Sequence, residues 1–558
     1  MSVVSQITLG AKVSHVTPLQ AMLITTVWIS SLAVQENLRS ALQDRFNKLL
    51  NTTVQFIATA PTPEGMYLFE CRLADLLHQM GLSLVECAMN NLEPEQAAEM
   101  PPRVRCGTAE FSRRGRKTNH RGGVACLFGT LDFMRWSYEP LSEESESGLK
   151  SIAPLVAQLG LVADKATPAL AEAIGRLSQE RSESSVGECL WREHHVSLAA
   201  ETVCSIRDAV AQGISKHMED ELVRTLLDAI QTGGTQGKVI LAVGRDGIFL
   251  PMRGGVTNDR FKEAAVATIS VYVKPPGAEK NRLCTIYLGQ MPQPGQEELT
   301  DRLTAVLQRV LSGTSAQDLQ LVYLTDAGHH PQEYFKNVLQ NMDNPQRPGK
   351  KLEWKWIVDY YHASLRLSTL ANLIFNHKGA ADDWVKKMRH TLKHESNAIH
   401  RILHSAAALK PKSLSGKMLK EYEDAYNYTS RGRDCRNHNT VCSFEPRQFP
   451  PSAVYLLKYR EAMNYATYRA QSLPIGSGVT EAACKTVFTQ RFKCSGMLWS
   501  RNNDYDHRDP EATLSRGRAV LTLRLAVLSR IYSTVFQKSL ATKTATARLI
   551  VTNLQLSS

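Results

Sequence analysis

The stretch KVILAVGRDGIFLPM, residues 238–252, decides the fold class, because it opens a series of β-strands in a chain whose flanking regions look helical. Further strands, rich in β-branched and aromatic residues, are predicted at AVATISVYV (265–273), RLCTIYLG (282–289), LQLVYLTD (319–326) and WKWIVD (354–359). A helical period over 296–313 separates the third strand from the fourth. Three strands followed by helix, strand, helix and strand predict a mixed α/β sheet.

Composition divides the rest of the chain. Hydrophobic residues make up 43% of the 558, enough to bury large cores, so wholesale disorder is excluded. We predict a helical region at 1–100, a basic β-hairpin region at 101–140, a helical region at 141–235, the first part of the sheet domain at 236–362, an all-helical insertion at 363–470, the second part of the sheet domain at 471–535 and a basic C-terminal tail at 536–558.

The cysteines and the best candidate for a membrane span indicate a compartment. Eleven cysteines are scattered without a Cys-x-x-Cys pair, which is typical of reduced thiols in a cytoplasm and not of a disulfide scaffold. The stretch Ala21–Val34 is 14 uncharged residues long, shorter than the ~20 residues that a membrane span needs. We therefore predict neither a membrane span nor a cleavable signal.

Positive charge is concentrated in a few regions. Lys plus Arg outnumber Asp plus Glu by 66 to 54, yet residues 1–100 carry 5 basic and 9 acidic side chains, a balance of −4. The balance is +6 over 103–121, +10 over 347–420 and +7 over 515–558. Such patches indicate a polyanionic partner. We predict DNA contacts by Arg113, Arg114, Arg116 and Lys117 in the hairpin region and by Lys386 and Lys387 in the insertion. For the hairpin region, a solvated loop beside an ordinary hairpin is the alternative.

A helix is predicted within 193–213. Ser197 is a suitable N-cap, and Val203, Ile206 and Val210 recur at helical spacing. The segment is compatible with the second helix of a DNA-reading helix-turn-helix and equally with plain helix packing.

Two acids follow predicted strands. Asp246 precedes Gly247, and Asp326 precedes Ala327. Taken singly, an aspartate at such a point is usually a turn residue. Taken together, two carboxylates at neighbouring strand ends can share a pair of Mg²⁺ ions, which prefer oxygen ligands and support phosphoryl transfer.

A third carboxylate lies in SLPIGSGVTEAACKTVFTQRFK, residues 472–493. Ser477 is placed to cap a helix that begins near Gly478, which puts Glu481 in the first turn or so. Lys485, Arg491 and Lys493 follow on the same helix, where we predict contacts with phosphates. On spacing alone, Glu481 is equally compatible with a capping-box acid.

The combined motifs resemble a known family. They are DG at 246–247, LTDAG at 324–328, DYYH at 359–362, PIGSGVTEAACK at 474–485 and RFKCSGMLWS at 491–500. Over about 238–535, this combination resembles the DDE transposases of bacterial insertion sequences, in particular the ISKra-type group related to the Mutator-like superfamily. The pattern in 474–500 is long and specific, whereas the two short aspartate motifs gain weight only from their order and spacing.

The resemblance implies an RNase H-like catalytic core with Asp246, Asp326 and Glu481 as metal ligands. It also assigns the family's acid-x-x-His motif to Asp359 and His362, which would orient the scissile strand or tune a metal ligand. Their ordinary role would be an N-cap and a packed histidine. The interval of 155 positions from Asp326 to Glu481 is explained by the all-helical insertion at 363–470, in which Trp384 is a candidate for stacking on an unpaired base or, more commonly, a core aromatic.

The sequence departs from the family near the hairpin. Relatives often carry a zinc ribbon there, but only Cys106, Cys126 and His120 are available, so we predict no structural zinc. After the second acid, His329 and His330 are interpreted as part of a polar loop.

The function implied is DNA transposition. Two Mg²⁺ ions, with Mn²⁺ able to substitute, would activate water to cleave double-stranded DNA at element ends and then the freed 3′-hydroxyl to attack target DNA. The resemblance further implies a homodimer or higher oligomer on DNA in a bacterial cytoplasm, associated with the nucleoid. The alternatives are an RNase H-like nuclease without strand transfer and a non-catalytic DNA-binding protein derived from a transposase.

Overall fold

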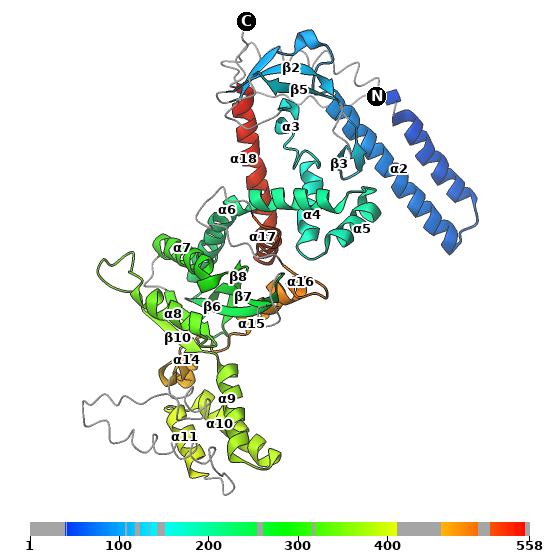
Figure 1. Ribbon diagram of the computed structural model, residues 1–558. Coiled ribbons are helices and arrows are strands. Elements are labelled where there is room, and N and C mark those ends of the chain that lie inside the picture. The colour runs from blue at the N-terminus through cyan, green and yellow to red at the C-terminus, as the bar shows by residue number, and fades with distance from the viewer. Residues whose placement is uncertain are drawn as a thin grey trace. The chain divides into compact units, whose positions relative to one another are not determined.

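The computed structural model describes residues 39–40, 42–106, 109–117, 123–132, 134–141, 151–253, 260–314, 319–409, 459–499 and 514–552 (Figure 1). The chain divides into two compact units. The first comprises residues 1–175, 182–210 and 540–558, and the second comprises 176–181 and 211–539. No single helix in the described part is long and apolar enough to span a membrane, although the bent pair Arg516–Leu528 and Tyr532–Lys543 meets that test by length and composition alone.

The described part of the first unit begins with two helices, over residues 42–58 and in α2 (Pro63–Asn90). Thr62 caps α2 by accepting a hydrogen bond from the Gly65 amide, with Pro63 in the first helical position. The ring of Phe56 stacks on that of Phe69 at 4.3 Å between centroids, which joins the two helices side by side. A short 3₁₀ turn, η1 (Ala97–Glu99), follows.

The basic region forms a three-stranded sheet, and this corrects the simple hairpin that we predicted. β2 (Ala109–Lys117) pairs antiparallel with both β1 (Arg103–Cys106) and β5 (Arg135–Pro140). The residues between them form a separate small hairpin of β3 (Val124–Cys126) and β4 (Gly129–Leu131). The reason is that Phe111, Trp136 and Tyr138 are buried together, which joins β2 to β5 instead of β3.

The second part of the first unit is helical, with α3 (Pro154–Gln158), α4 (Pro168–Ser178) and α5 (Glu183–His194). His195 follows α5 as its C-cap and adopts a left-handed conformation with φ 54°. α6 (Ala200–Gly234) then runs for 35 residues, so the helix predicted within 193–213 begins later and extends much further. Gly213 lies inside α6. A Cβ there would lie 2.3 Å from Ser539 Oγ, so the missing side chain leaves room for α18 (Tyr532–Thr552).

The second unit contains a five-stranded sheet, which confirms the mixed α/β sheet expected from the sequence. Its order is β10-β9-β6-β7-β8. The antiparallel strands are β6 (Lys238–Pro251), β7 (Phe261–Lys274) and β8 (Asn281–Gln290), and β9 (Leu319–Thr325) and β10 (Trp354–Val358) run parallel to β6. This arrangement is consistent with an RNase H-like core.

Helices cover the sheet. α7 (Glu297–Gly313), preceded by η2 (Pro294–Gln296), leads from β8 to β9, while α8 (His329–Asn337) and η4 (Leu339–Asn341) lead from β9 to β10. α17 (Arg516–Leu528) packs on β8, where a Cβ at Gly289 would meet Leu521 and Leu525 at 3.4–3.5 Å. A buried ion pair between Arg518 and Glu298 fixes α17 to α7.

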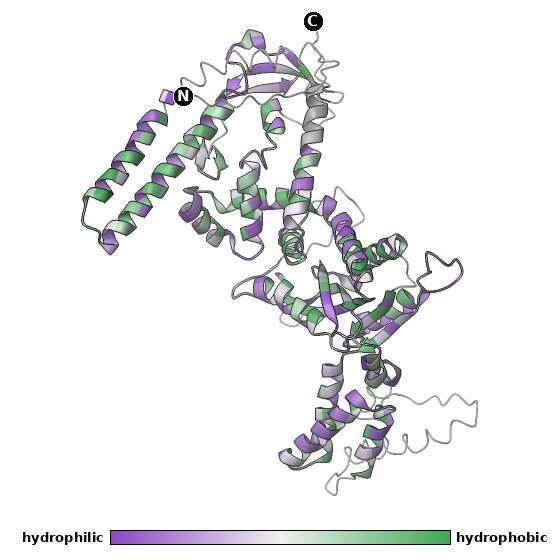
Figure 2. Cartoon of the chain, turned by 180° about the vertical axis from the view of Figure 1, so that it is seen from behind, coloured by the Kyte–Doolittle hydropathy of each residue, from purple (hydrophilic) through white to green (hydrophobic). Residues whose placement is uncertain are grey.

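The chain after β10 forms α9 (Tyr360–Ile374), α10 (Lys378–His394) and α11 (Ala398–Ala408), and it returns through η7 (Arg460–Met463) and α14 (Tyr465–Ala470). These helices lie together beyond the end of β10 (Figure 1), and α10 is striped with polar and apolar residues (Figure 2). They share one apolar core with the sheet, which includes Val322, Ile357 and Leu367. Trp384 belongs to that core with 7% exposure, so its ordinary role holds and base stacking is excluded in this conformation.

The C-terminal segment is helical over most of the range predicted as a basic tail. Residues 532–552 form α18, so most of the predicted basic tail at 536–558 is helix. Tyr532, Val535 and Phe536 are buried at helical spacing, which explains why this stretch folds despite its lack of acidic residues.

Candidate active site

Asp246 and Asp326 share a level on neighbouring strands. The parallel register of β6 and β9 ends at the pair Val243 and Tyr323, and each acid follows that pair by three residues. Asp246 itself lies inside its strand and not at the end that we predicted, because β6 continues to pair with β7 as far as Pro251. On the other side of β6, the neighbouring strand β9 has already ended, which leaves Asp246 at the edge of the parallel part of the sheet.

Asp359 lies at the same edge. β9 and β10 pair as far as Thr325 and Val358, and Asp326 and Asp359 each follow by one residue. Asp326 and Asp359 therefore stand at the carboxyl ends of β9 and β10, and Asp246 lies level with them inside β6, where the parallel part of the sheet ends. This is the edge at which open α/β sheets commonly place their sites.

Asp359 is fully buried and links two chain segments. One carboxylate oxygen caps α9 by accepting the His362 amide at 2.7 Å, and the other accepts the amide of Ser477. Burial opposes ionisation, but the hydrogen bonds from His362 and Ser477 outweigh it and lower the pKa of Asp359. The carboxylate is therefore held in place by the backbone of both segments.

Glu481 lies on the short helix α15 (Gly478–Ala483), which begins where the sequence predicted. Ser477 precedes the helix, but its hydroxyl donates to Glu481 Oε1 at 2.9 Å and makes no side-chain cap. The chain then continues into a π-helical turn, η8 (Cys484–Thr489), and α16 (Gln490–Phe492). Such π turns are frequent at functional sites.

A close approach between α15 and the sheet fixes the position of Glu481. The hydroxyl of Thr480 lies 2.7 Å from that of Thr268 on β7. On β6, a Cβ added to Gly244 would lie only 1.9 Å from Thr480 Oγ1. Glycine at 244 therefore leaves the space that Thr480 fills, and the neighbouring Glu481 is carried to the edge where the three aspartates lie.

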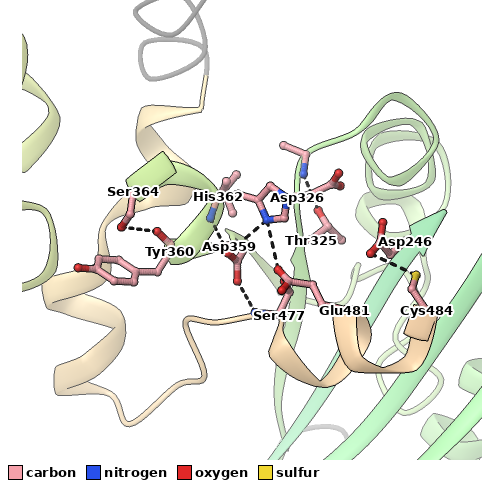
Figure 3. Close-up of polar contacts among 12 residues, drawn as sticks. Asp246, Thr325, Asp326, Asp359, Tyr360, His362, Ser364, Ser477, Glu481 and Cys484 are labelled. Carbon is pink, nitrogen blue, oxygen red and sulfur yellow. Dashed lines mark hydrogen bonds and ion pairs between the residues drawn. The ribbon is translucent and has the colours of Figure 1, made fainter. Parts of the chain in front are cut away.

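His362 connects the two acids that lie nearest to it (Figure 3). Its Nδ1 atom is 3.4 Å from Asp359 Oδ1 and 3.3 Å from Glu481 Oε1. The hydrogen bond with Asp359 raises the pKa of His362, while partial burial opposes the shift and the charges of Asp326 and Glu481 add to it. The protonated imidazole is therefore favoured between two carboxylates.

Asp246 lies on the other side of the site with Cys484 as its neighbour (Figure 3). The thiol donates to Asp246 Oδ2 at 3.3 Å, and the Gly247 amide donates to Oδ1 at 2.7 Å. Burial raises the pKa of Asp246 to about 6, and the nearby Asp326 adds to that shift. Burial together with Asp246 raises the pKa of the Cys484 thiol strongly, so the sulfur stays protonated and acts as a donor.

These acids fit a hard divalent cation. Carboxylate oxygens are the ligands that such ions prefer. The pKa of Asp246 is raised chiefly by burial and further by the charge of Asp326, and a bound cation would favour the ionised carboxylate. Among the described residues, Asp359, His362 and Glu481 bring donor atoms within 4.8 Å of one another, as do His329, His330 and Glu333 on α8. Glu481 is thus grouped with Asp359 and His362, and not directly with the other two predicted ligands.

The predicted DNA-binding residues fall into two sets. Lys386, Lys387, Lys485 and Lys493 are exposed. Arg491 is only 2% exposed, and its guanidinium donates to the carbonyl of Arg181 at 2.9 Å. The prediction that Arg491 contacts phosphate is therefore wrong for this conformation, because the side chain fastens α16 to another segment.

The hairpin region shows the same division. Arg114 and Lys117 are exposed beside Glu139. Arg113 donates to two backbone carbonyls and stacks on Trp136, and the largely covered side chain of Arg116 donates to the Asn90 carbonyl. The side chains of Arg113 and Arg116 therefore stabilise the fold around the three-stranded sheet.

Several residues of the site were missed by the sequence reasoning. Cys484, Thr480 and Gly244 carried no recognisable chemistry, although the first two lie inside the quoted motif at 474–485. His329 and His330, predicted to lie in a polar loop, instead begin α8. His120 lies outside the described residues, while Cys126 is a buried free thiol within an apolar cluster.

Comparisons with known proteins found little. No family model matches the chain, and no curated protein matches it. Among solved structures, the chain is similar to the Drosophila P element transposase strand transfer complex, with 9% sequence identity over 64% of this chain and 92% of that chain, at a TM-score of 0.25. A TM-score of this size does not establish a shared fold, so the case for a function rests on the geometry of the site.

Proposed function

We propose that this chain is a DNA transposase that cleaves DNA and joins the 3′-hydroxyl end to a target by metal-dependent phosphoryl transfer. One observation carries the proposal: Asp246, Asp326 and Asp359 lie level at the edge where the parallel strands β6, β9 and β10 stop pairing, and α15 brings Glu481 to the same edge. This is the arrangement that the sequence motifs led us to expect of an RNase H-like nucleotidyl-transfer core. Double-stranded DNA is the proposed substrate, and a homodimer or larger assembly would hold two DNA ends.

Mg²⁺ or Mn²⁺ would be held by Asp246, Asp326 and Glu481. When bound, a pair of such ions supplies activation of the attacking oxygen and stabilisation of the leaving oxygen. Asp246 and Asp326 supply the paired negative charge on neighbouring strands, and burial raises the pKa of Asp246 to about 6 when no cation is bound. Cys484 orients the Asp246 carboxylate through its hydrogen bond.

Asp359 and His362 position Glu481 in this proposal. Asp359 fixes the Ser477 amide at the start of α15, and the imidazole of His362 lies between Asp359 and Glu481. The pair therefore restrains the third acid from two directions, and neither side chain needs to touch the reacting phosphate. The exposed lysines on α10 and after α15 are suited to phosphate contacts, which position DNA without reading its sequence.

The test is a strand-transfer assay with DNA that carries the native sequences on both sides of the coding region. Wild-type protein with Mg²⁺ is expected to nick these ends and to join the 3′-hydroxyl to a target plasmid. Asp246→Ala, Asp326→Ala and Glu481→Ala should bind the DNA and give neither product. Asp343→Asn, which changes an acid that is 74% exposed, serves as the matched control.

The outcomes separate the candidate functions. Cleavage without a joined product would reject the transposase and leave a nuclease. DNA binding without cleavage by the wild-type protein would leave a non-catalytic DNA-binding protein. Wild-type activity in the Asp246→Ala variant would overturn the assignment of the metal ligands.

A further inference from the structure

An open cavity of ≈ 570 Å³ lies beside the candidate site in the second unit. Its walls come from β8, α9, α10 and the segment around α15, with Arg282, Tyr287, Tyr360, Tyr361, Lys393 and Gly476 among the lining residues. The volume falls within the ~300–1,000 Å³ typical of small-molecule sites. None of its ten lining residues, all of them described, is acidic. The cavity therefore combines aromatic and cationic groups without a compensating negative charge.

Tyr361 provides an accessible aromatic surface. It is 67% exposed, although large apolar side chains are normally covered. Its ring stands edge-on to that of Tyr360, with 5.6 Å between the centroids. A Cβ at Gly476 would lie 3.1 Å from Tyr361 Cε2, so the glycine lets the ring lie close to the backbone. The tyrosine is thus held in place while much of its surface faces solvent.

The cations line the same cavity. Lys393 lies with its Nζ atom 5.5 Å from the centre of the Tyr360 ring, which places the ammonium against an aromatic wall. Tyr360 is itself anchored, because its hydroxyl donates to the Arg389 carbonyl at 3.2 Å. Arg282 is exposed at the start of β8. Lys393 therefore lies against the tyrosine pair, and Arg282 adds a second cation to the lining of the cavity.

The cavity shares its backbone with the acids. Tyr360 and Tyr361 directly follow Asp359, and Ala482, another lining residue, directly follows Glu481. A DNA strand with one phosphate at the acids would bring an adjacent nucleotide to this cavity. Aromatic rings beside basic side chains are the combination that binds single-stranded nucleic acid, through base stacking and phosphate contacts.

We propose that this cavity binds one unpaired nucleotide, with its base stacked on Tyr361 and its phosphate facing Arg282 and Lys393. This inference rests on the proposed function, because it places the nucleotide next to the phosphate that is cleaved. The chemistry recognised is a base joined to a phosphate. The proposed ligand is a nucleotide of the DNA strand. A free mononucleotide carries the same base and phosphate groups and is the alternative ligand.

The experiment uses the full chain in EDTA and a short single-stranded oligothymidylate that carries one 2-aminopurine. Stacking of the probe base quenches its fluorescence, and a titration gives the dissociation constant. Tyr361→Ala is expected to weaken binding by about tenfold or more and to abolish the quenching, while Tyr361→Phe keeps the ring and should stay within about threefold of wild type. Leu365→Ala, at a 60% exposed position one turn later on α9, is the matched control and should have no effect.

The cations are tested in the same way. Lys393→Gln should reduce the slope of log affinity against log salt by roughly one phosphate contact. Lys336→Gln, at an exposed position on α8, is the matched control and should leave the quenching of the probe intact. Competition with thymidine monophosphate distinguishes the sources: displacement at micromolar concentration identifies a free mononucleotide, and displacement only by oligonucleotide identifies the DNA strand.

Two results would overturn the inference. One is equal binding and quenching by Tyr361→Ala and Leu365→Ala, and the other is quenching that survives in Tyr361→Ala and Lys393→Gln together. Because the assay needs neither metal nor cleavage, its failure is separate from a failure of the transposase proposal. Conversely, quenching that depends on Tyr361 in a protein without strand transfer would reject only the transposase.

Discussion

Replacing Gly244 by alanine is expected to displace the third acid without touching it. The added Cβ would lie 1.9 Å from Thr480 Oγ1, whereas ordinary contact begins at 3.4 Å, so the two atoms must separate by about 1.5 Å (3.4 − 1.9). Rotation of the Thr480 hydroxyl cannot remove the conflict, because the Thr480 Cβ would also be 3.1 Å away and the hydrogen bond to Thr268 would be lost. α15 must therefore move away from the sheet.

The magnitude follows from that displacement. Overpacking a buried contact costs about 1–3 kcal/mol in the free energy of unfolding, and a misplacement of about 1 Å in a catalytic group costs on the order of 100-fold in rate. We expect Gly244→Ala to stay folded, to lose about 1–3 kcal/mol of stability and to lose cleavage by on the order of 100-fold. Urea unfolding and the metal-dependent cleavage assay measure the two effects.

Two further variants make the reasoning refutable. Gly244→Ala with Thr480→Ala removes the closest contact and should recover part of the stability and of the activity. Gly379→Ala on α10, where an added Cβ meets nothing within 4 Å, is the control and should leave both unchanged or slightly raise stability. A Gly244→Ala protein with wild-type stability and activity would refute the claim that this contact positions Glu481.

The remaining predictions concern charge. Folding raises the pKa of Asp246 from 3.8 to about 6, so its contribution opposes folding increasingly as pH rises through that window. Asp246→Asn should therefore abolish cleavage yet raise the free energy of unfolding at pH 8 in EDTA by up to about 3 kcal/mol, with the gain vanishing near pH 4 in urea titrations. Glu298→Ala removes the buried carboxylate that pairs with Arg518 and should cost about 3–5 kcal/mol, whereas methionine at both positions should cost far less by the same measurement. Arg491→Ala should lower the thermal midpoint of unfolding and leave the salt dependence of DNA binding per folded molecule unchanged. Lys485→Ala should leave the thermal midpoint unchanged and reduce the slope of log affinity against log salt by about 1.

The sheet was predictable because its strands are written as apolar runs with turn residues between them. The five strands predicted from 238 to 359 all form, and Asp326 and Asp359 follow their strands as expected. Asp246 shows the limit of that reasoning: a strand can end for one neighbour and continue for the other, and only pairing across the sheet distinguishes these cases. The level alignment of the three acids is a property of register, which a single strand does not carry.

Charge was less predictable than strand position. The segment 515–558 has seven basic residues and no acidic ones, which suggested a surface for DNA. Yet Arg518 and Arg524 are 5% and 4% exposed, and they bond to Glu298 and to the Thr486 carbonyl. Arginine presents several donors in a planar group, so it can satisfy distant carbonyls in a folded interior as readily as phosphates outside. A local count of basic residues therefore overstates the surface that is available to nucleic acid.

Glu481 is separated from Asp326 by 155 residues, and its position depends on two unlike anchors. Ser477 binds Asp359 through its backbone amide, a contact that any residue except proline could make. Thr480 instead needs both its own hydroxyl and the absence of a side chain at Gly244. The first anchor fixes where α15 begins, and the second fixes how closely it approaches the sheet. Together they define the position of Glu481 more tightly than the intervening helices could. A shift in those helices can be taken up by the chain before Ser477, whereas the two contacts act on the residues next to Glu481.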